Sequence, residues 1–351
     1  MWKPETRVEA PVAIHGRDGS FSDRWIEFCS ANGVPYRVVS CYDNDIIRSL
    51  RECSALLWHF GHGLATDLLM ARHVLASAEA MGLVTFPDAA TCWHFDDKVA
   101  QKYLLEALGA PLVPTYVFYD LAAALQWIDT AVFPKVFKLR RGSGSRNVQL
   151  VRTPEHARSL AKTAFGKGFR PSGSEVRDLW KVAHAWRNQN LSAFVRAVPL
   201  RLRNRWRLDA RIGRENGYLY FQEFIPNNRF DTRVTVIGDR AFGFTRDVRP
   251  DDFRASGSGR LVHDTTRVRA QCVKTAFDVA RSMPAQSVAF DFLDDGTERP
   301  LIGEISYGYD SKPVYDVGGY WRPDLTWCEG GVWPEHAIMM DVLTRVVDRR
   351  S

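Results

Sequence analysis

Residues 133–151, FPKVFKLRRGSGSRNVQLV, hold two short apolar segments on either side of a turn rich in glycine, serine and arginine. Strand-forming residues that flank such a turn predict a β-hairpin. Lys135 and Lys138 lie on its first strand, and the turn is small and basic. Successive backbone amides of a small turn can surround an anion, and a lysine adds the opposing charge. The stretch therefore predicts a hairpin that closes over polyphosphate, although by itself a glycine-rich loop is weak support.

The bulk composition sets the class of protein. The chain has 351 residues, of which 45% are hydrophobic and 25% charged, as in an ordinary globular protein. The formal net charge of +6 favours anionic ligands without choosing among nucleotides, nucleic acid and a membrane surface. We find neither a leader-like N-terminus nor a run of about 18 apolar residues, so we expect a cytoplasmic protein without a membrane span. The six cysteines include no CxxC pair, which argues against a structural metal site.

The order of strands and helices predicts an α/β fold whose catalytic part is α+β. Strands alternate with helices over roughly the first 90 residues, which indicates a parallel α/β layer. Closely spaced strands in the second half, with turns such as Ile237-Gly238-Asp239, predict an antiparallel sheet. We therefore expect an N-terminal α/β domain over residues 1–95, a small lobe with the hairpin over 96–217 and a C-terminal lobe over 218–351.

Two segments leave alternatives open. The third expected strand, 55–60, ends at His59-Phe60-Gly61-His62, where open α/β sheets bind ligands, so it predicts either a substrate-recognition loop or an ordinary glycine turn. Residues 196–214 hold seven arginines against the single acid Asp209. This stretch is either a solvated connection or a basic surface for a nucleotide-sugar, a phospholipid headgroup or nucleic acid.

Buried carboxylates point to a metal. Neither GxxxxGK[ST] nor GxGxxG occurs, which excludes two familiar phosphate-binding loops. Asp291 lies in the apolar run VAFDFL and Glu304 in PLIGEIS. A carboxylate among apolar residues is costly unless it is paired or bound to a metal. Two of them on neighbouring strands suit Mg²⁺, although each alone is also compatible with a structural salt bridge.

Several motifs follow one another in an informative order: Asp97-Lys98, Lys138 before the glycine turn, Glu223-Phe224-Ile225, Asp231-Thr232-Arg233, Arg246, Asp252-Phe253-Arg254, Asp291 and Glu304. This order resembles the ATP-grasp superfamily, and its spacing is most similar to the RimK-type carboxylate-amine ligases. The resemblance covers about residues 97–306. It implies two lobes that hold ATP between them, preceded by an α/β domain.

The resemblance also implies roles for single residues. ATP would be bound by Lys98, Lys138, Gly142, Ser143, Gly144, Ser145, Glu223, Phe224, Ile225, Asp231 and Arg233. Arg246 and Arg254 would act on the phosphate and the acyl phosphate. Asp291, Glu304 and Ser306 would hold Mg²⁺, with Mn²⁺ as an alternative. The family usually has asparagine where this chain has Ser306, a shorter and weaker ligand, so the number of metal ions stays open.

The activity implied by the resemblance is amide formation between a carboxylate and an amine, through an acyl phosphate. Segments 19–25, 91–98 and 306–334 also resemble ATP-grasp proteins found with bacterial surface-polysaccharide biosynthesis, which would make one substrate sugar-linked. Two alternatives are a kinase-type phosphotransferase and a non-catalytic nucleotide- or nucleic-acid-binding protein.

Further expectations concern the substrates and partners. The partners would be a small carboxylate and a small amine. Nucleic acid is disfavoured, whereas peripheral membrane contact and a homodimer stay open. Tyr309, Asp310, Lys312 and Asp316, just after the magnesium motif, are candidates for the acceptor pocket. Arg140, Arg141 and Arg146 make the hairpin more basic than phosphate closure requires, which favours a second anionic substrate beneath it.

Overall fold

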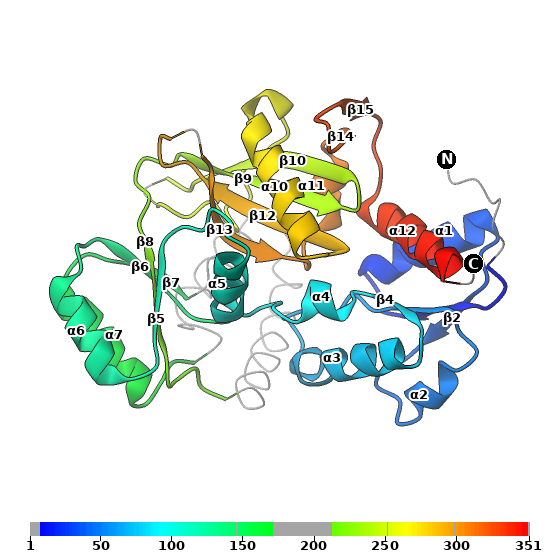
Figure 1. Ribbon diagram of the computed structural model, residues 1–351, viewed down its shortest axis with the longest axis horizontal. Helices are drawn as coiled ribbons and strands as arrows, with labels where there is room; N and C mark the ends of the chain where they lie inside the picture. Colours follow the sequence, from blue (N-terminus) through cyan, green and yellow to red (C-terminus); the bar gives the residue numbers. More distant parts are fainter. Residues whose placement is uncertain are drawn as a thin grey trace, which may run out of the picture.

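The computed structural model describes residues 8–142, 144, 147–170, 213–250, 252–297 and 299–349. Three sheets organise this part of the chain, and each belongs to a different region of the molecule (Figure 1). Ser143, Ser145, Arg146 and nearly all of the basic stretch 196–214 lie outside the described residues. Their expected roles therefore stay predictions.

The N-terminal sheet is parallel, as its alternating pattern predicted. Its strand order is β2 (Tyr36–Val39), β1 (Val12–His15), β3 (Ala55–Leu57) and β4 (Val84–Phe86). Helix α3 (Ala65–Ala80) lies on one face of the sheet, and α1 (Phe21–Asn32) lies on the other (Figure 1). The short helices α2 (Ile46–Ser49) and α4 (Ala89–Cys92) complete the region. The order reverses between β1 and β3, so the carboxyl ends of these two strands form a crevice of the kind that binds ligands.

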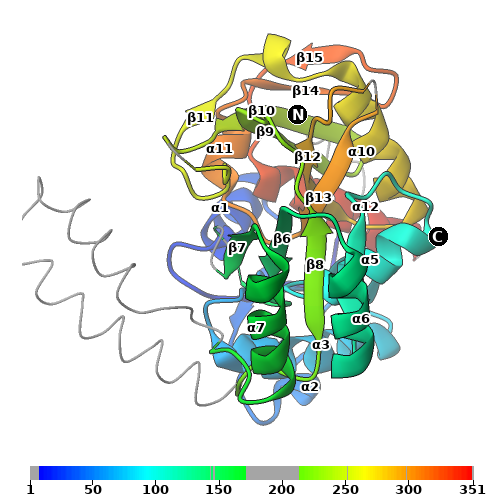
Figure 2. The same ribbon diagram turned by 90° about the vertical axis from the view of Figure 1, so that its left-hand side faces the viewer.

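The small lobe contains the hairpin. Strands β6 (Lys135–Lys138) and β7 (Val148–Val151) pair antiparallel, which confirms the hairpin. The complete sheet has the order β5 (Thr115–Phe118), β8 (Leu219–Glu223), β6 and β7. Figure 2 shows α6 (Leu121–Thr130) and α7 (Pro154–Phe165) over its outer face. Strand β8 follows the expected boundary after residue 217 and yet lies inside this sheet, so the small-lobe sheet extends to Glu223.

The large lobe is built on the expected antiparallel sheet. Its strands are ordered β13 (Leu301–Ser306), β12 (Ser287–Leu293), β9 (Phe230–Ile237), β10 (Arg240–Asp247), β14 (Gly319–Trp321) and β15 (Trp327–Glu329), and β11 (Leu261–Val262) pairs with β10. Helix α10 (Ala270–Ser282) packs on the sheet, preceded by the 3₁₀ turn Thr265–Arg267. Helix α5 (Lys98–Ala107) contacts β13.

The last helix packs against the N-terminal region. After α11 (Ser311–Tyr315), helix α12 (Pro334–Asp348) packs on α1 and β4 of the N-terminal region (Figure 1). One buried apolar cluster consequently includes N-terminal residues, α12 and residues of the large-lobe sheet such as Phe242 and Ala289. Within it Tyr307 is fully buried, and its hydroxyl donates to the carbonyl of Phe60 at 2.5 Å. None of the described helices is long and apolar enough to cross a membrane.

Candidate functional site

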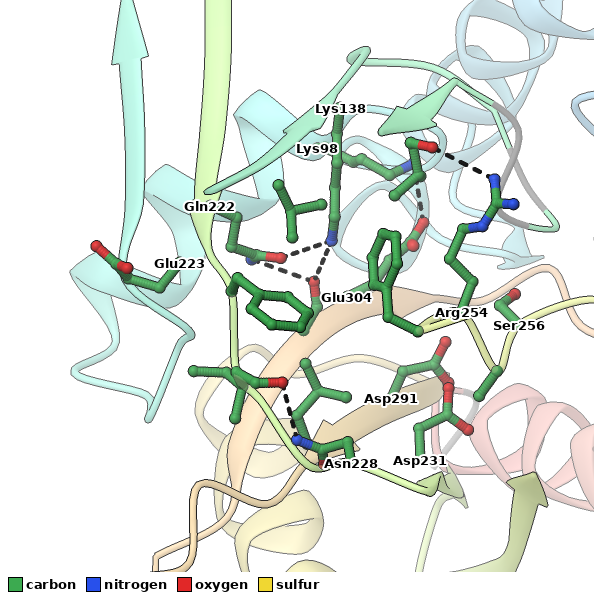
Figure 3. Close-up of a pocket in the computed structure, with 18 of the residues that line it drawn as sticks. Lys98, Lys138, Gln222, Glu223, Asn228, Asp231, Arg254, Ser256, Asp291 and Glu304 are labelled. Carbon is green, nitrogen blue, oxygen red and sulfur yellow. Dashed lines mark hydrogen bonds and ion pairs between the residues drawn. The ribbon is translucent and has the colours of Figure 1, made fainter. Parts of the chain in front are cut away.

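A cavity between the small and large lobes brings the predicted motifs together (Figure 3). They arrive from α5, strand β6 and the hairpin turn, strand β8 and the segment after it, strand β9, the loop after β10 and strands β12 and β13. The predicted residues that line it are Lys98, Lys138, Gly142, Glu223, Phe224, Ile225, Asp231, Arg254, Asp291 and Glu304. Residues separated by up to 206 positions in sequence therefore share one cavity.

Lys98 is positioned by the start of a helix. Asp97 caps α5, because its carboxylate accepts hydrogen bonds from the amides of Val99 and Ala100 at 3.1 and 3.0 Å. Lys98 is consequently the first residue of α5, and its Nζ reaches the carbonyl of Gly142 at 2.8 Å and the carboxylate of Glu304 at 3.0 Å. One lysine thus contacts both the hairpin turn and the carboxylate of β13.

Lys138 ends the first hairpin strand and points into the cavity (Figure 3). Its Nζ donates to Oε1 of Gln222 at 2.6 Å. Burial lowers the pKa of Lys138 to about 8, although Glu304 nearby raises it. Gln222 was missed in the sequence, where the only signal was a polar residue in the otherwise apolar start of β8, LYFQ. It holds the lysine at the cavity wall.

The glycine turn is clamped from two sides. The amide of Gly142 donates to Asp96 at 2.9 Å, while its carbonyl accepts from Lys98. Asp96 has φ of 54°, a conformation that is uncommon outside glycine, and burial raises its pKa. At the tip, a side chain on Gly257 would meet the carbonyl oxygen of Gly144 at 3.1 Å. Two glycine-rich loops, around 142–144 and 256–259, therefore meet over the cavity.

The carboxylate pair lies where the sequence predicted it. Asp291 on β12 is the direct register partner of Glu304 on β13, and the pairing shifts immediately after Asp291. Arg233 binds Asp291 through two nitrogens at 2.7 and 2.9 Å. Although burial opposes the charge, Arg233 and Arg246 hold the pKa of Asp291 below its usual range. Asp291 is therefore a carboxylate at neutral pH, as a metal ligand must be.

Arg246 is buried next to Asp291 of this pair. Its Nη2 lies 2.6 Å from Asp231 and 2.7 Å from Asp291, and its side chain is only 6% exposed. These two carboxylates hold the pKa of Arg246 above its usual range against the effect of burial. Arg246 is absent from the described residues that line the cavity, whereas Arg254 lines it and contacts the carbonyl of Val148 at 3.4 Å. Arg246 is thus buried among carboxylates, whereas Arg254 lines the cavity.

The expected adenine hinge forms one edge of the cavity. Phe224 and Ile225 line it. The side chain of Glu223 points away (Figure 3): it pairs with Lys135 and accepts from Tyr116 at 2.9 Å. Asn228, a second residue missed in the sequence, donates to the carbonyls of Ile225 and Asp294 at 3.2 and 2.9 Å. It ties the hinge to the large lobe.

A second cavity adjoins the first one. The two share four lining residues, Gly142, Ser256, Asp291 and Glu304. The second cavity is also lined by residues that the sequence singled out, namely His59, His62, Gly144, Arg233, Ser306, Tyr309 and Asp310, and by Asp96. Lys312 and Asp316 pair with each other instead and are absent from its described lining. The carboxylate pair therefore stands at the boundary between the two cavities.

Ser306 is not free to bind a metal without rearrangement. Its hydroxyl donates to the carbonyl of Gly308 at 3.0 Å and accepts from the Gly308 amide at 3.1 Å. In the part of the chain that the structure describes, no group of three or more His, Cys, Asp and Glu side chains is arranged to hold a metal. Asp291 and Glu304 alone fit Mg²⁺, which is bound by one or two carboxylates together with phosphate oxygens.

Residues of the N-terminal region form one wall of the second cavity, and hydrogen bonds and ring stacking hold them in place. His59 stacks on Phe21 with ring centres 3.8 Å apart, and its Nδ1 lies 3.0 Å from the Ser20 hydroxyl. Burial lowers its pKa to about 3, so His59 is neutral at physiological pH. The buried carboxylate of Asp67 accepts from the amide of Gly61 at 2.9 Å and from Arg17 at 2.8 Å. The loop 59–62 therefore faces the second cavity in a fixed conformation.

Two of the three excess arginines of the hairpin, Arg140 and Arg141, have a structural explanation, whereas Arg146 lies outside the described residues. Arg140 and Arg141 lie 3.5 and 3.7 Å from the buried carboxylate of Glu215. The Arg140 amide also donates to the Tyr218 hydroxyl at 2.7 Å, and that hydroxyl donates to Glu215 at 2.9 Å. Because these two arginines fix the base of the hairpin, they do not support the expected second anionic substrate beneath it.

Comparisons with known proteins give the class of fold. No protein-family model matches the sequence, and no curated protein matches it. A RimK domain ATP-grasp protein from Sphaerobacter thermophilus has 17% identity and a TM-score of 0.57, covering 95% of this chain and 99% of that one. D-alanine–D-alanine ligase from Bacillus anthracis, solved with ATP, has 11% identity and a TM-score of 0.56, covering 98% and 100%.

A third solved structure adds a bound nucleotide. The biotin carboxylase domain of the Hydrogenobacter thermophilus 2-oxoglutarate carboxylase, solved as a dimer with MgADP and bicarbonate, has 15% identity and a TM-score of 0.58, covering 94% of this chain and 69% of that one. Together these likenesses show that the chain has the ATP-grasp fold. They confirm the fold class that the order of motifs predicted.

Proposed function

We propose that this protein is an ATP-dependent ligase that joins a carboxylate to an amine. The observation that carries the proposal is the pair of adjoining cavities with Asp291 and Glu304 at their boundary. The first cavity has the lysines and the hinge for ATP, and the second has space for the compounds to be joined. D-alanine–D-alanine ligase, one of the solved structures of the same fold, supports this assignment.

ATP would lie with its adenine against Phe224 and Ile225 and its phosphates toward Lys98, Lys138 and Arg254. Mg²⁺ would be held by Asp291 and Glu304, where it would neutralise phosphate charge. The MgADP bound to a structure of this fold supports that choice of ion. Arg246 and Asp231 would act as positioning residues, because Arg246 pairs with Asp291 and Asp231 in turn pairs with Arg246.

The reaction has two steps. An oxygen of the substrate carboxylate attacks the γ-phosphorus, and the bond to the β,γ-bridging oxygen breaks as ADP leaves. The amine nitrogen then attacks the acyl carbon of the acyl phosphate, loses a proton, and phosphate leaves with the former carboxylate oxygen. The protein's part is positioning and neutralisation of the charge on the transferred group by Lys98, Lys138 and Arg254.

The second cavity also contains the candidates for the group that takes the amine proton. A general base works best with a pKa near the working pH, and burial lowers that of His59 to about 3. Asp310 is proposed on its position alone, because it is exposed at the same cavity. The narrower resemblance to proteins of surface-polysaccharide biosynthesis adds the proposal that one substrate is sugar-linked. Mn²⁺, a homodimer and a cytoplasmic location stay predictions from the sequence.

A screen of carboxylates against amines tests the proposal, with uronic-acid sugar nucleotides among the acids. ADP, free phosphate and product mass are measured for each pair. A ligase releases one ADP and one phosphate for each amide formed, and both substrates are required for full turnover. A phosphorylated product without free phosphate identifies the phosphotransferase alternative and contradicts the proposal.

A further inference from the structure

An open groove lies beside the nucleotide cavity, where the hinge and the loop after β10 meet strand β7 of the small lobe. We call it the arginine groove, after the six arginines that line it: Arg152, Arg229, Arg249, Arg254, Arg260 and Arg267. The acids among its described lining residues are Asp247 and Asp252. Among the described lining residues, six arginines less two aspartates leave four positive charges around one opening.

Three of these arginines bind a neighbouring group closely, and a fourth, Arg260, makes a longer hydrogen bond of 3.5 Å to the carbonyl of Val248. Arg254 and Arg267 pair with the two aspartates at 2.6 and 2.7 Å, and Arg249 donates to the carbonyl of Gly257 at 2.6 Å. Arg152, Arg229 and Arg260 make no ion pair with any carboxylate among the described residues, and all three are exposed. Guanidinium groups gathered around one opening repel one another, so an anion bound between them relieves an unfavourable field.

The groove is separate from the predicted ATP site. Phe224, Asn228, Phe253 and Arg254 line both openings, and the rings of the two phenylalanines lie 5.8 Å apart at 84°. These side chains form the partition between the cavities. Arg152, Arg229 and Arg260 line the groove and are absent from the described lining of the nucleotide cavity.

The arrangement favours phosphate over single carboxylates. An arginine presents a planar fork that binds two oxygens of a phosphate, and a terminal phosphate carries nearly two negative charges at neutral pH. A ligand with two or three linked phosphates can therefore neutralise the surplus of four charges within a small space. Arg152 comes from the small lobe and Arg229 and Arg260 from the large one, so such a ligand would contact both lobes.

We propose that the arginine groove binds a second phosphorylated compound, an oligophosphate with at least two linked phosphates, while ATP occupies the neighbouring cavity. The site does not depend on the ligase activity, because binding is measurable in the absence of any reaction. The groove is thus an anion-binding site at the junction of the lobes, and it differs from the site expected beneath the hairpin.

Calorimetry tests this site with the nucleotide cavity filled. The protein is saturated with the non-hydrolysable analogue AMP-PNP and excess Mg²⁺, and inorganic tripolyphosphate is then titrated. We expect binding of one equivalent that weakens steeply with added salt. The combined variant Arg152→Ala/Arg229→Ala/Arg260→Ala should weaken it at least tenfold while the affinity for AMP-PNP stays unchanged, which also shows that the variant folds.

A matched variant removes the same charge elsewhere. Arg48→Ala/Arg51→Ala/Arg281→Ala lowers the net charge by three at exposed positions outside the groove, and it should bind tripolyphosphate like the parent. Equal weakening in both triple variants would overturn the proposal, because only overall charge would then matter. Absence of binding to the nucleotide-saturated protein, or tighter binding of hexaglutamate than of tripolyphosphate, would overturn it as well.

Discussion

Asp291 shows how one residue is kept charged in an apolar strand. Burial alone would favour the protonated acid, but two guanidiniums hold its pKa below the usual range. Arg233 approaches from the side of the second cavity, and Arg246 from behind. Removing the charge therefore affects both the proposed metal site and a buried network.

Asp291→Asn keeps the size of the side chain and removes its charge. We expect turnover to fall by about 10² to 10³, the loss commonly seen when one group that stabilises a transition state is removed. The measurement is ADP release at saturating ATP and Mg²⁺, with thermal unfolding as a check of the fold. Asp278→Asn, at an exposed position on α10, is the control and should keep full activity. Near-parental turnover of Asp291→Asn would remove it from the site.

Lys138 gives a pH dependence with a definite sign. Because its pKa is about 8, the lysine of the free protein loses its proton above that pH. Phosphates of ATP favour the charged form, so nucleotide binding at pH 8.5 should take up a proton, and affinity should fall as the pH rises above about 8. Calorimetry in two buffers with different ionisation enthalpies measures the uptake.

Lys138→Arg is the matched variant, because arginine keeps its charge throughout this range. It should bind ATP without the proton uptake and without the loss of affinity above pH 8. An uptake of equal size in parent and variant would assign the titration to another group.

At the scale of elements, the two glycine-rich loops approach each other closely. Gly142 is fixed by Asp96 and Lys98, and the tip at Gly144 approaches Gly257 closely. Both Gly257 and Gly259 have positive φ, 70° and 74°, but a side chain on Gly259 would meet nothing within 4 Å. Substitutions at these two positions therefore distinguish the effect of backbone strain, which both share, from the effect of contact between the loops, which only Gly257 has.

Gly257→Ala should raise the KM for ATP several-fold, because its methyl group would press on Gly144 and hinder closure. Gly259→Ala carries the same conformational strain and is the control, for which we expect a smaller effect. The comparison is made from initial rates over a range of ATP concentrations. Equal KM values in the two variants would show that the contact between the loops is unimportant.

The sequence predicted elements better than it predicted their partners. The hairpin and the pairing of Asp291 and Glu304 on neighbouring apolar strands followed from local pattern and composition, although Glu304 is half-buried. Arg246 was expected to contact phosphate, yet a strand pattern does not show whether an arginine faces a cavity or a buried acid. Likewise, Glu215 lies 75 residues after Arg140, so its pairing with the hairpin arginines depends on tertiary structure. The placement of β8 in the small-lobe sheet was hidden for the same reason.

At the scale of the molecule, the N-terminal region and the large lobe share a core. Helix α12 and residues of the large-lobe sheet belong to the same buried cluster as the N-terminal strands. The small lobe has a separate cluster beneath α6 and α7. The wall of the second cavity is therefore packed in one core with part of the large-lobe sheet, whereas the small lobe has a core of its own.

Tyr307→Phe tests this shared core. It removes the hydroxyl that donates to Phe60 and leaves a buried carbonyl unpaired, which should cost about 1–3 kcal/mol. Hydrogen exchange should show earlier opening of β3 and β13 together. Tyr315→Phe, at a half-buried position on α11 with the ring stacked on Trp333, is the control and should change little. Opening confined to one of the two strands would contradict a common core.

The central claim is that a substrate carboxylate is activated as an acyl phosphate. The most direct measurement uses the carboxylate found in the screen, labelled with ¹⁸O in its carboxyl group, and mass spectrometry of the phosphate released during turnover with the amine. We predict that one ¹⁸O atom appears in each phosphate, together with one amide and one ADP. Unlabelled phosphate accompanying amide formation would contradict the account.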